Sequence, residues 1–105
     1  MAVNINKINS MDKIEHIKTV YKIPVDFTPR QVLKLPKGSE ILGFQSKPEK
    51  IFLLLLADME SNVMEDRIIG IYGEGHNVGC KDHDYLGNFE LDNGAYLYHA
   101  FELFE

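Results

Sequence analysis

The sequence predicts a single all-β domain, either a small antiparallel β-sandwich or a partly open barrel of about seven strands, preceded by a short N-terminal arm. Segments rich in β-branched and aromatic residues recur along the chain, and turn signals with glycine, proline or asparagine separate them about every eight to twelve residues. The length of 105 residues suits one domain, which at this size buries roughly two thirds of its unfolded surface.

The predicted arm covers residues 1–18, and the β domain covers residues 19–105. In the arm, isoleucine and methionine recur at three-residue steps from Ile5 to Ile17, which favours a short amphipathic helix. A helix of this length is marginal alone, so the arm is expected to be helical or disordered. Met11 leaves a second interpretation open, in which the first ten residues are an upstream extension.

The strands of the domain are separated by recognisable turns. Pro24 interrupts the first strand, which indicates an edge strand or a strand end. Pro36–Ser39 has the residues of a tight turn, and Asp92–Gly94 contains the Asn-Gly pair that favours a two-residue hairpin turn. The predicted strands are residues 19–25, 31–35, 40–46, 51–57, 67–72, 85–91 and 95–104.

Two strands are apolar on both faces. The run Ile51–Ala57 is continuous, and its seven residues between turn signals favour a strand covered on both sides over a buried helix. The last strand, residues 95–104, has leucine, histidine and phenylalanine on one face and tyrosine and alanine on the other. Aromatic residues are enriched at interfaces, so we expect either another segment or a second copy of the chain to cover it, and we predict a homo-oligomer.

Composition excludes several classes of function. The net charge of −5 disfavours general nucleic-acid binding, which needs a surplus of lysine and arginine. A single cysteine allows no disulfide within the chain and fits a reducing compartment. The first residues have no signal-peptide pattern, and the longest apolar run is far too short to cross a membrane. We therefore expect neither a nucleic acid nor a membrane as partner.

One segment has the character of a ligand site. The strand ending at Tyr72 runs into Gly73-Glu74-Gly75-His76, where two glycines allow a close approach of the backbone and a histidine supplies a donor. A plain glycine turn at a strand exit is the alternative, because no helix follows and no phosphate-loop motif is complete. The candidate ligand-binding residues are Arg67, Tyr72, Gly73, Gly75, His76 and Lys81.

The loop after this turn raises two further hypotheses. His76, Cys80 and His83 have the spacing H-x3-C-x2-H, which could supply three zinc ligands, but the paired ligands typical of structural zinc sites are missing. A cysteine–histidine nucleophile lacks an orienting third residue. His99, within an apolar strand, fits a core histidine. We therefore predict no metal, no cofactor and no catalytic residue, and the question of an enzyme activity stays open.

Several blocks of sequence resemble a family of small bacteriophage proteins of unknown function. The resemblance covers about residues 20 to 102, and it is specific through the combination of blocks. Glu74 and Asn88 stand where the family often has threonine, and Cys80 and His83 lie outside its pattern. The blocks are Val20–Pro24, Leu35–Leu42, Ile69–His76, Tyr85–Phe89 and Tyr98–Glu102.

The resemblance implies a phage protein that works in the cytoplasm of an infected host. We expect a non-enzymatic binding protein, a host-takeover or counter-defence factor that sequesters a nucleotide signal as an oligomer. The alternatives are a protein-binding inhibitor of a host defence effector, CRISPR-type, or of a polymerase, a small metal-dependent hydrolase, and an accessory component of the virion.

Overall fold

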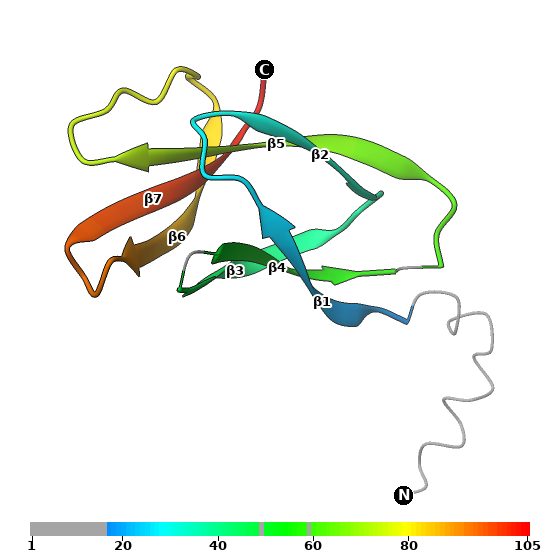
Figure 1. Ribbon diagram of the computed structural model, residues 1–105. Helices are drawn as coiled ribbons and strands as arrows, with labels where there is room; N and C mark the ends of the chain where they lie inside the picture. The colour runs from blue at the N-terminus through cyan, green and yellow to red at the C-terminus, as the bar shows by residue number, and fades with distance from the viewer. Residues whose placement is uncertain (1–16, 49, 59) are drawn as a thin grey trace, which may run out of the picture.

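The computed structural model describes residues 17–48, 50–58 and 60–105, and in these ranges every regular element is a strand (Figure 1). The predicted arm lies outside the described residues except for Ile17 and Lys18. Within the described ranges, no helix is long and apolar enough to cross a bilayer. The strands are β1 (Thr19–Val25), β2 (Gln31–Pro36), β3 (Glu40–Lys47), β4 (Lys50–Ala57), β5 (Met64–Gly73), β6 (His83–Leu91) and β7 (Tyr96–Leu103).

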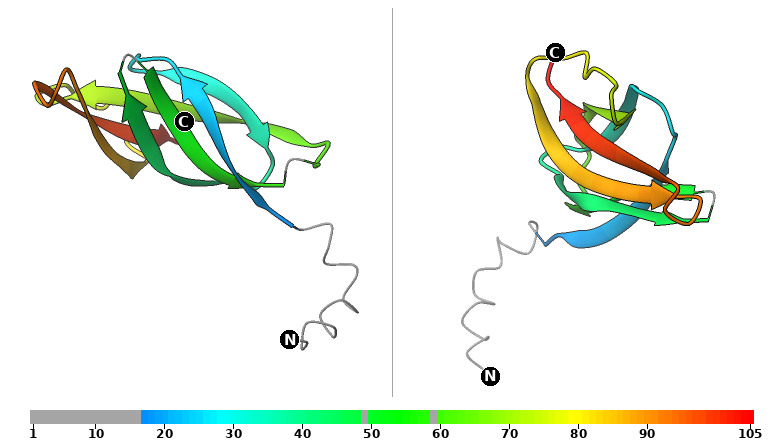
Figure 2. Two further views of the ribbon diagram at one scale, coloured as in Figure 1. Left: turned by 60° about the horizontal axis from the view of Figure 1, so that its bottom comes forward. Right: turned by 90° about the vertical axis from the view of Figure 1, so that its left-hand side faces the viewer.

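The strands form two antiparallel sheets that pack face to face. The first sheet has the order β1-β4-β3, and the second has the order β2-β5-β7-β6. Figure 2 shows the two layers from two further sides. The predicted all-β sandwich is therefore confirmed, and the two sheets do not join into a closed barrel. β1 is an edge strand, as Pro24 indicates, because its free side needs no backbone N–H at that position.

The core lies between the sheets and follows the two-residue period of the strands. On β4, alternate residues from Ile51 to Ala57 face inward and are at most 5% exposed. From the second sheet, Ile71 on β5 and Ala100 on β7 pack in one cluster with Ile51, and Ile69 on β5 is fully buried. Burial of such aliphatic side chains, about 1.5–3 kcal/mol each, is what holds the two layers together.

The outer face of β4 differs from the expectation. The apolar run forms a strand, as predicted, but Phe52 and Leu54 on its outer face are only half-buried. On the flanking strands, Val20 is 62% exposed and Leu42 is 48% exposed. Within the described residues the neighbours β1 and β3 shield this face from the sides, and no element lies over it.

Strand ends differ slightly from the prediction. β5 begins at Met64, three residues earlier than expected. The reason is that every residue of β2 pairs with β5, and the last of them, Pro36, lies opposite Met64. The expected hairpin turn is present. Asn93 and Gly94 both have positive φ, 55° and 88°, and the N–H of Ala95 donates to the carbonyl of Asp92 at 3.0 Å.

Candidate functional site

The connection between β5 and β6 covers part of the outer face of the second sheet. Both strands are antiparallel to β7 and lie on either side of it, so they run parallel to each other. Their connection, residues 74–82, therefore crosses over β7 (Figure 1). It crosses on the outer face, since the sandwich core fills the inner one. We call this segment the crossover loop.

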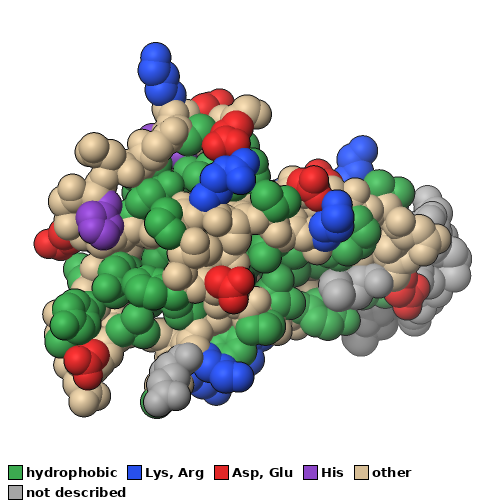
Figure 3. Space-filling view, turned by 45° about the horizontal axis from the view of Figure 1, so that its top comes forward, with side chains coloured by type: hydrophobic (Ala, Val, Ile, Leu, Met, Phe, Trp, Pro, Cys, Tyr) green, Lys and Arg blue, Asp and Glu red, His purple; other side chains and the backbone are tan. Residues whose placement is uncertain are grey.

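A cleft of about 300 Å³ lies between the crossover loop and the outer face of the sheet. Phe101 lies at the centre of its floor, with the ring of Tyr85 at 5.2 Å and the ring of Tyr72 at 5.9 Å, both inclined by 64°. Hydrophobic surface is visible over this end of the molecule, with a histidine at its margin (Figure 3). The lining residues are Tyr72, Gly73, Glu74, Gly75, His76, Val78, Tyr85, His99 and Phe101.

A β-bulge in β6 equips the floor with polar groups. The pairing register shifts between Tyr85 and Gly87, so that Leu86 is the extra residue. Because of this shift, Tyr85 and Asn88 share the outer face although they are three residues apart. The side-chain amide of Asn88 donates to Tyr85 Oη at 3.3 Å, and Tyr85 Oη lies 2.8 Å from His99 Nδ1. These contacts hold the Tyr85 ring, which is 53% exposed, in a fixed orientation.

The first turn of the crossover loop is closed on itself. The N–H of His76 donates to the carbonyl of Gly73 at 3.2 Å, and the N–H of Gly73 donates to His76 Nδ1, also at 3.2 Å. Gly75 has a φ of +88°, which glycine adopts without strain. Because Nδ1 accepts a hydrogen bond, the neutral imidazole of His76 has its proton on Nε2 and can donate it outward.

The other end of the loop is pinned beside the end of β7. The thiol of Cys80 lies 3.3 Å from the backbone carbonyl of Asp82 and 3.2 Å from that of Phe104. The backbone N–H of Phe104 donates to the backbone carbonyl of Asp82 at 2.8 Å. His83 Nδ1 donates to the carbonyl of Cys80 at 2.9 Å. Cys80 and the two histidines of the H-x3-C-x2-H pattern thus have separate partners. Among the described residues, no three such side chains lie close enough to share a metal ion.

The structure places Arg67 away from the cleft. Its side chain points between the sheets, on the face of β5 opposite to Tyr72. Its guanidinium forms a two-contact ion pair with Glu102, donates to the carbonyl of Ser39 at 2.8 Å and reaches Glu65 at 3.3 Å. The hydrogen bond with Glu102 raises the pKa of Arg67 above its usual value. The arginine therefore joins β5, β7 and the β2–β3 turn, and it lies on the face of β5 opposite to the cleft.

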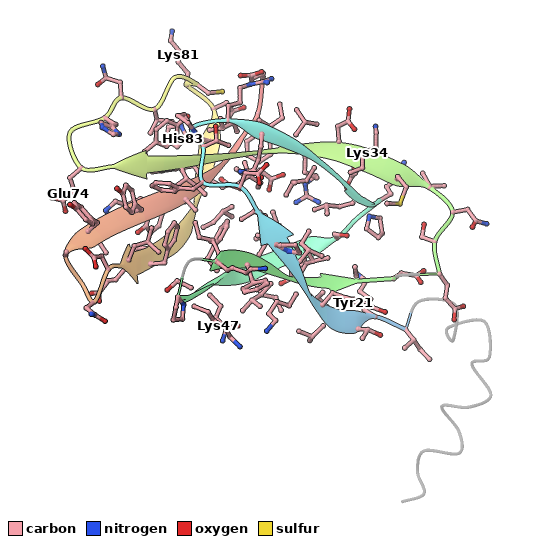
Figure 4. All side chains as sticks on the ribbon, viewed as in Figure 1. Tyr21, Lys34, Lys47, Glu74, Lys81 and His83 are labelled. Atoms are coloured by element: carbon pink, nitrogen blue, oxygen red, sulfur yellow. The ribbon has the colours of Figure 1, made fainter. Side chains whose placement is uncertain are left out.

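The charge around the cleft is also different from what the sequence suggested. Lys81 is exposed and lies on the crossover loop with its side chain pointing away from the sheet, whereas Glu74 lies at the end of β5 beside the cleft (Figure 4). Among the described residues that line the cleft, Glu74 is the carboxylate, and neither lysine nor arginine is present. Tyr72, Gly73, Gly75 and His76 do line the cleft, so the structure brings four of the six candidate residues together and places Arg67 and Lys81 elsewhere.

The floor of the cleft was missed by sequence reasoning. Tyr85, Asn88, His99 and Phe101 come from two strands whose pairing is not visible in the sequence. His99, expected in the core, is half-buried on the outer face and hydrogen-bonded to Tyr85. One signal was present: Gly87 within a strand pattern is typical of a bulge, and the bulge is what aligns Tyr85 with Asn88.

The fold and the cleft define a small two-sheet β-sandwich domain with an aromatic cleft under a crossover loop. The sequence profile of one family, described as a domain of unknown function (DUF7352), matches residues 16–105. The chain belongs to this family. No curated protein and no solved structure matches the chain.

Proposed function

We propose that this domain is a non-enzymatic binding protein that holds the planar ring of a small nucleotide in the aromatic cleft. The observation that carries the proposal is the cleft floor, in which Tyr72, Tyr85 and Phe101 surround one hollow of about 300 Å³. That volume is at the lower end of the range for ligand pockets. Aromatic side chains stack on any nucleobase, and each stack contributes about 1–3 kcal/mol.

The charges support one orientation of the nucleotide. Glu74 repels a phosphate but accepts hydrogen bonds from the N–H groups of a base. The base therefore enters the cleft, where Tyr85, His99 and the Nε2–H of His76 offer further hydrogen bonds, and the phosphate points to solvent.

The positions of the reactive side chains support a binding protein rather than an enzyme. Cys80, the single cysteine, lies against two backbone carbonyls rather than a base. The chain Asn88–Tyr85–His99 ends on the imidazole, and in the described residues no serine, threonine or cysteine is hydrogen-bonded to that imidazole. Nucleophilic catalysis needs a nucleophile and a base in hydrogen-bond contact.

The resemblance to bacteriophage proteins supplies the biological setting of the proposal. In that setting the domain is a phage-encoded counter-defence factor that sequesters a nucleotide signal in the host cytoplasm. Self-association remains part of the proposal, and it is supported by the exposed apolar side chains of Val20 and Leu42 on the outer face of the first sheet.

Calorimetric titration with a panel of nucleotides tests the proposal directly. We expect at least one nucleoside phosphate or cyclic nucleotide to bind, and Tyr85→Ala to weaken that binding by 1–3 kcal/mol, about 5- to 150-fold. Val63→Ala, an exposed apolar truncation in the connection between β4 and β5, is the matched control and should leave nucleotide binding unchanged. No binding heat and no thermal shift across the whole panel would refute the proposal.

A second candidate function, inhibition of a host defence effector or polymerase by protein binding, is favoured by a different surface. A groove of about 560 Å³ beside β5 and β7 has carboxylates from Asp66, Asp84 and Glu105 on its walls. Lys34 pairs with Asp66 and Arg30 with Glu105, which leaves Asp84 as the carboxylate among these three that has no ion pair within the described residues. Such a groove complements a basic partner. Pull-down from host lysate should then recover one dominant protein, and Asp84→Asn should reduce its recovery. An empty pull-down would count against this function.

A further inference from the structure

A second hollow adjoins the aromatic cleft. It has a volume of about 380 Å³ and lies along the first residues of β7 and the β6–β7 turn. Gly73, Glu74 and His76 line both hollows. The two hollows therefore share one short turn. Because Tyr96 and His99 lie on opposite faces of β7, a ligand that fills both hollows has to pass across that turn.

The second hollow has an aromatic surface of its own. Tyr96 is 56% exposed there, with its ring 6.4 Å from that of Tyr98. Tyr98 is held by Phe27, edge to face at 4.5 Å, and by Phe89 at 6.0 Å. The surface thus combines one fixed ring with one ring open to solvent, an arrangement on which a planar group can stack.

The turn between the hollows offers both a donor and an acceptor. His76 Nδ1 is occupied by the N–H of Gly73, which leaves the Nε2–H to donate to a group lying across the turn. The Glu74 carboxylate accepts hydrogen bonds and adds one negative charge. A terminal phosphate, with a charge of about −1.5 to −2, is repelled by Glu74 more strongly than a phosphodiester, with a charge of about −1.

We propose that the two hollows together bind one dinucleotide, with a base in each hollow and the phosphodiester crossing the Gly73–His76 turn on its solvent side, away from the Glu74 carboxylate. This inference rests on the proposed function and specifies its ligand class. Two separate mononucleotides fit less well, because they would share three lining residues and each would pay the full entropic cost of association. When two bases are linked, translational and rotational entropy is lost once for both. The second base therefore adds affinity with little further loss of entropy.

The test compares ligands with one and with two bases on the full chain. Calorimetry with AMP and GMP, with the linear dinucleotides ApA and GpG, and with the corresponding cyclic dinucleotides should give at least tenfold tighter binding for a two-base ligand. Equal or weaker binding of every two-base ligand would overturn the inference and leave the proposed function standing. If no probe binds at all, the proposed function and the inference both fail.

Variants assign the two bases to the two hollows. Tyr96→Ala should weaken the two-base ligand by about 5- to 150-fold, the contribution of one stack, and change mononucleotide binding less than twofold. Tyr85→Ala should weaken binding of both ligands, and Val63→Ala should weaken neither. Ala95→Glu, which places a carboxylate at the second hollow, should act like Tyr96→Ala. If both second-hollow variants leave two-base binding unchanged, the second base does not lie there and the inference is wrong.

Discussion

The ion pair between Arg67 and Glu102 makes Arg67→Met the most demanding test of the fold. The two side chains are 17% and 8% exposed, and they join β5 to β7 between the sheets. Methionine keeps much of the apolar length of arginine but has no donor. The substitution therefore leaves the Glu102 carboxylate without its cation, and it also removes a donor from the carbonyl of Ser39 at 2.8 Å.

The expected loss is a large part of the total stability. Removing one partner of a buried ion pair costs about 3–5 kcal/mol, because the remaining charge stays in a poorly solvated place. Domains of this size have unfolding free energies of about 5–15 kcal/mol. Each kcal/mol lowers the melting temperature of a small domain by about 4–8 °C, so Arg67→Met should melt about 12 °C or more below the wild type.

Urea unfolding followed by far-ultraviolet circular dichroism measures the effect. Lys34→Met is the matched control, because it breaks the ion pair of Lys34 with Asp66, whose side chains are 74% and 58% exposed. Exposed pairs contribute about 0–1 kcal/mol, so this variant should lose no more than that. Arg67→Met combined with Glu102→Leu should recover most of the loss, since an apolar pair needs no compensating charge.

Two results would refute this reasoning. One is a decrease in the unfolding free energy of Arg67→Met no larger than that of the Lys34→Met control. This result would mean that water solvates Glu102 once the arginine is gone. The other is a double variant less stable than either single variant, which would mean that the space between the sheets cannot take two apolar side chains.

Three further predictions concern packing and pH. Gly70→Ala should destabilise the domain by about 1–3 kcal/mol in urea unfolding, because the new Cβ would lie 2.6 Å from the carbonyl oxygen of Pro29. Leu53→Ala, at a side chain with 0% exposure, should cost about 2–5 kcal/mol in the same assay. Hydrogen bonding to Arg30 lowers the pKa of Glu105 below its usual value of 4.5. In a nuclear magnetic resonance titration, the pKa of Glu105 should therefore be lower in the wild type than in the Arg30→Gln variant. The stabilisation from this pair is therefore present above about pH 4.5 and lost as the pH falls through the folded-state pKa.

The strands were predictable because each has its own local signal. Alternation, the Pro36–Ser39 turn and the Asn-Gly pair at 93–94 depend on neighbouring residues only, and the structure confirms a strand for every predicted segment. The order of the strands depends on pairings far apart in the chain. Nothing local indicates that β7 lies between β5 and β6, and the crossover loop follows from that placement alone.

The candidate site was predictable in part for the same reason. Tyr72 to His76 are contiguous, so one local turn brings them to the cleft. Arg67 is five residues before Tyr72, and an odd separation along a strand places the two side chains on opposite faces. The face of Tyr85 relative to Asn88 depended on the bulge at Leu86, whose position only the paired strand reveals.

The central place of β7 has a consequence for how the protein is made. β5 pairs with β2 as well as with β7, whereas β6 pairs with β7 alone and joins its sheet only through that strand. During synthesis on a ribosome, the strands up to β6 emerge before the strand that joins them. The second sheet can therefore be completed only once the last strand of the domain has left the ribosome, and until then β6 has no partner in its sheet. The domain is thus expected to finish folding after β7 emerges rather than strand by strand.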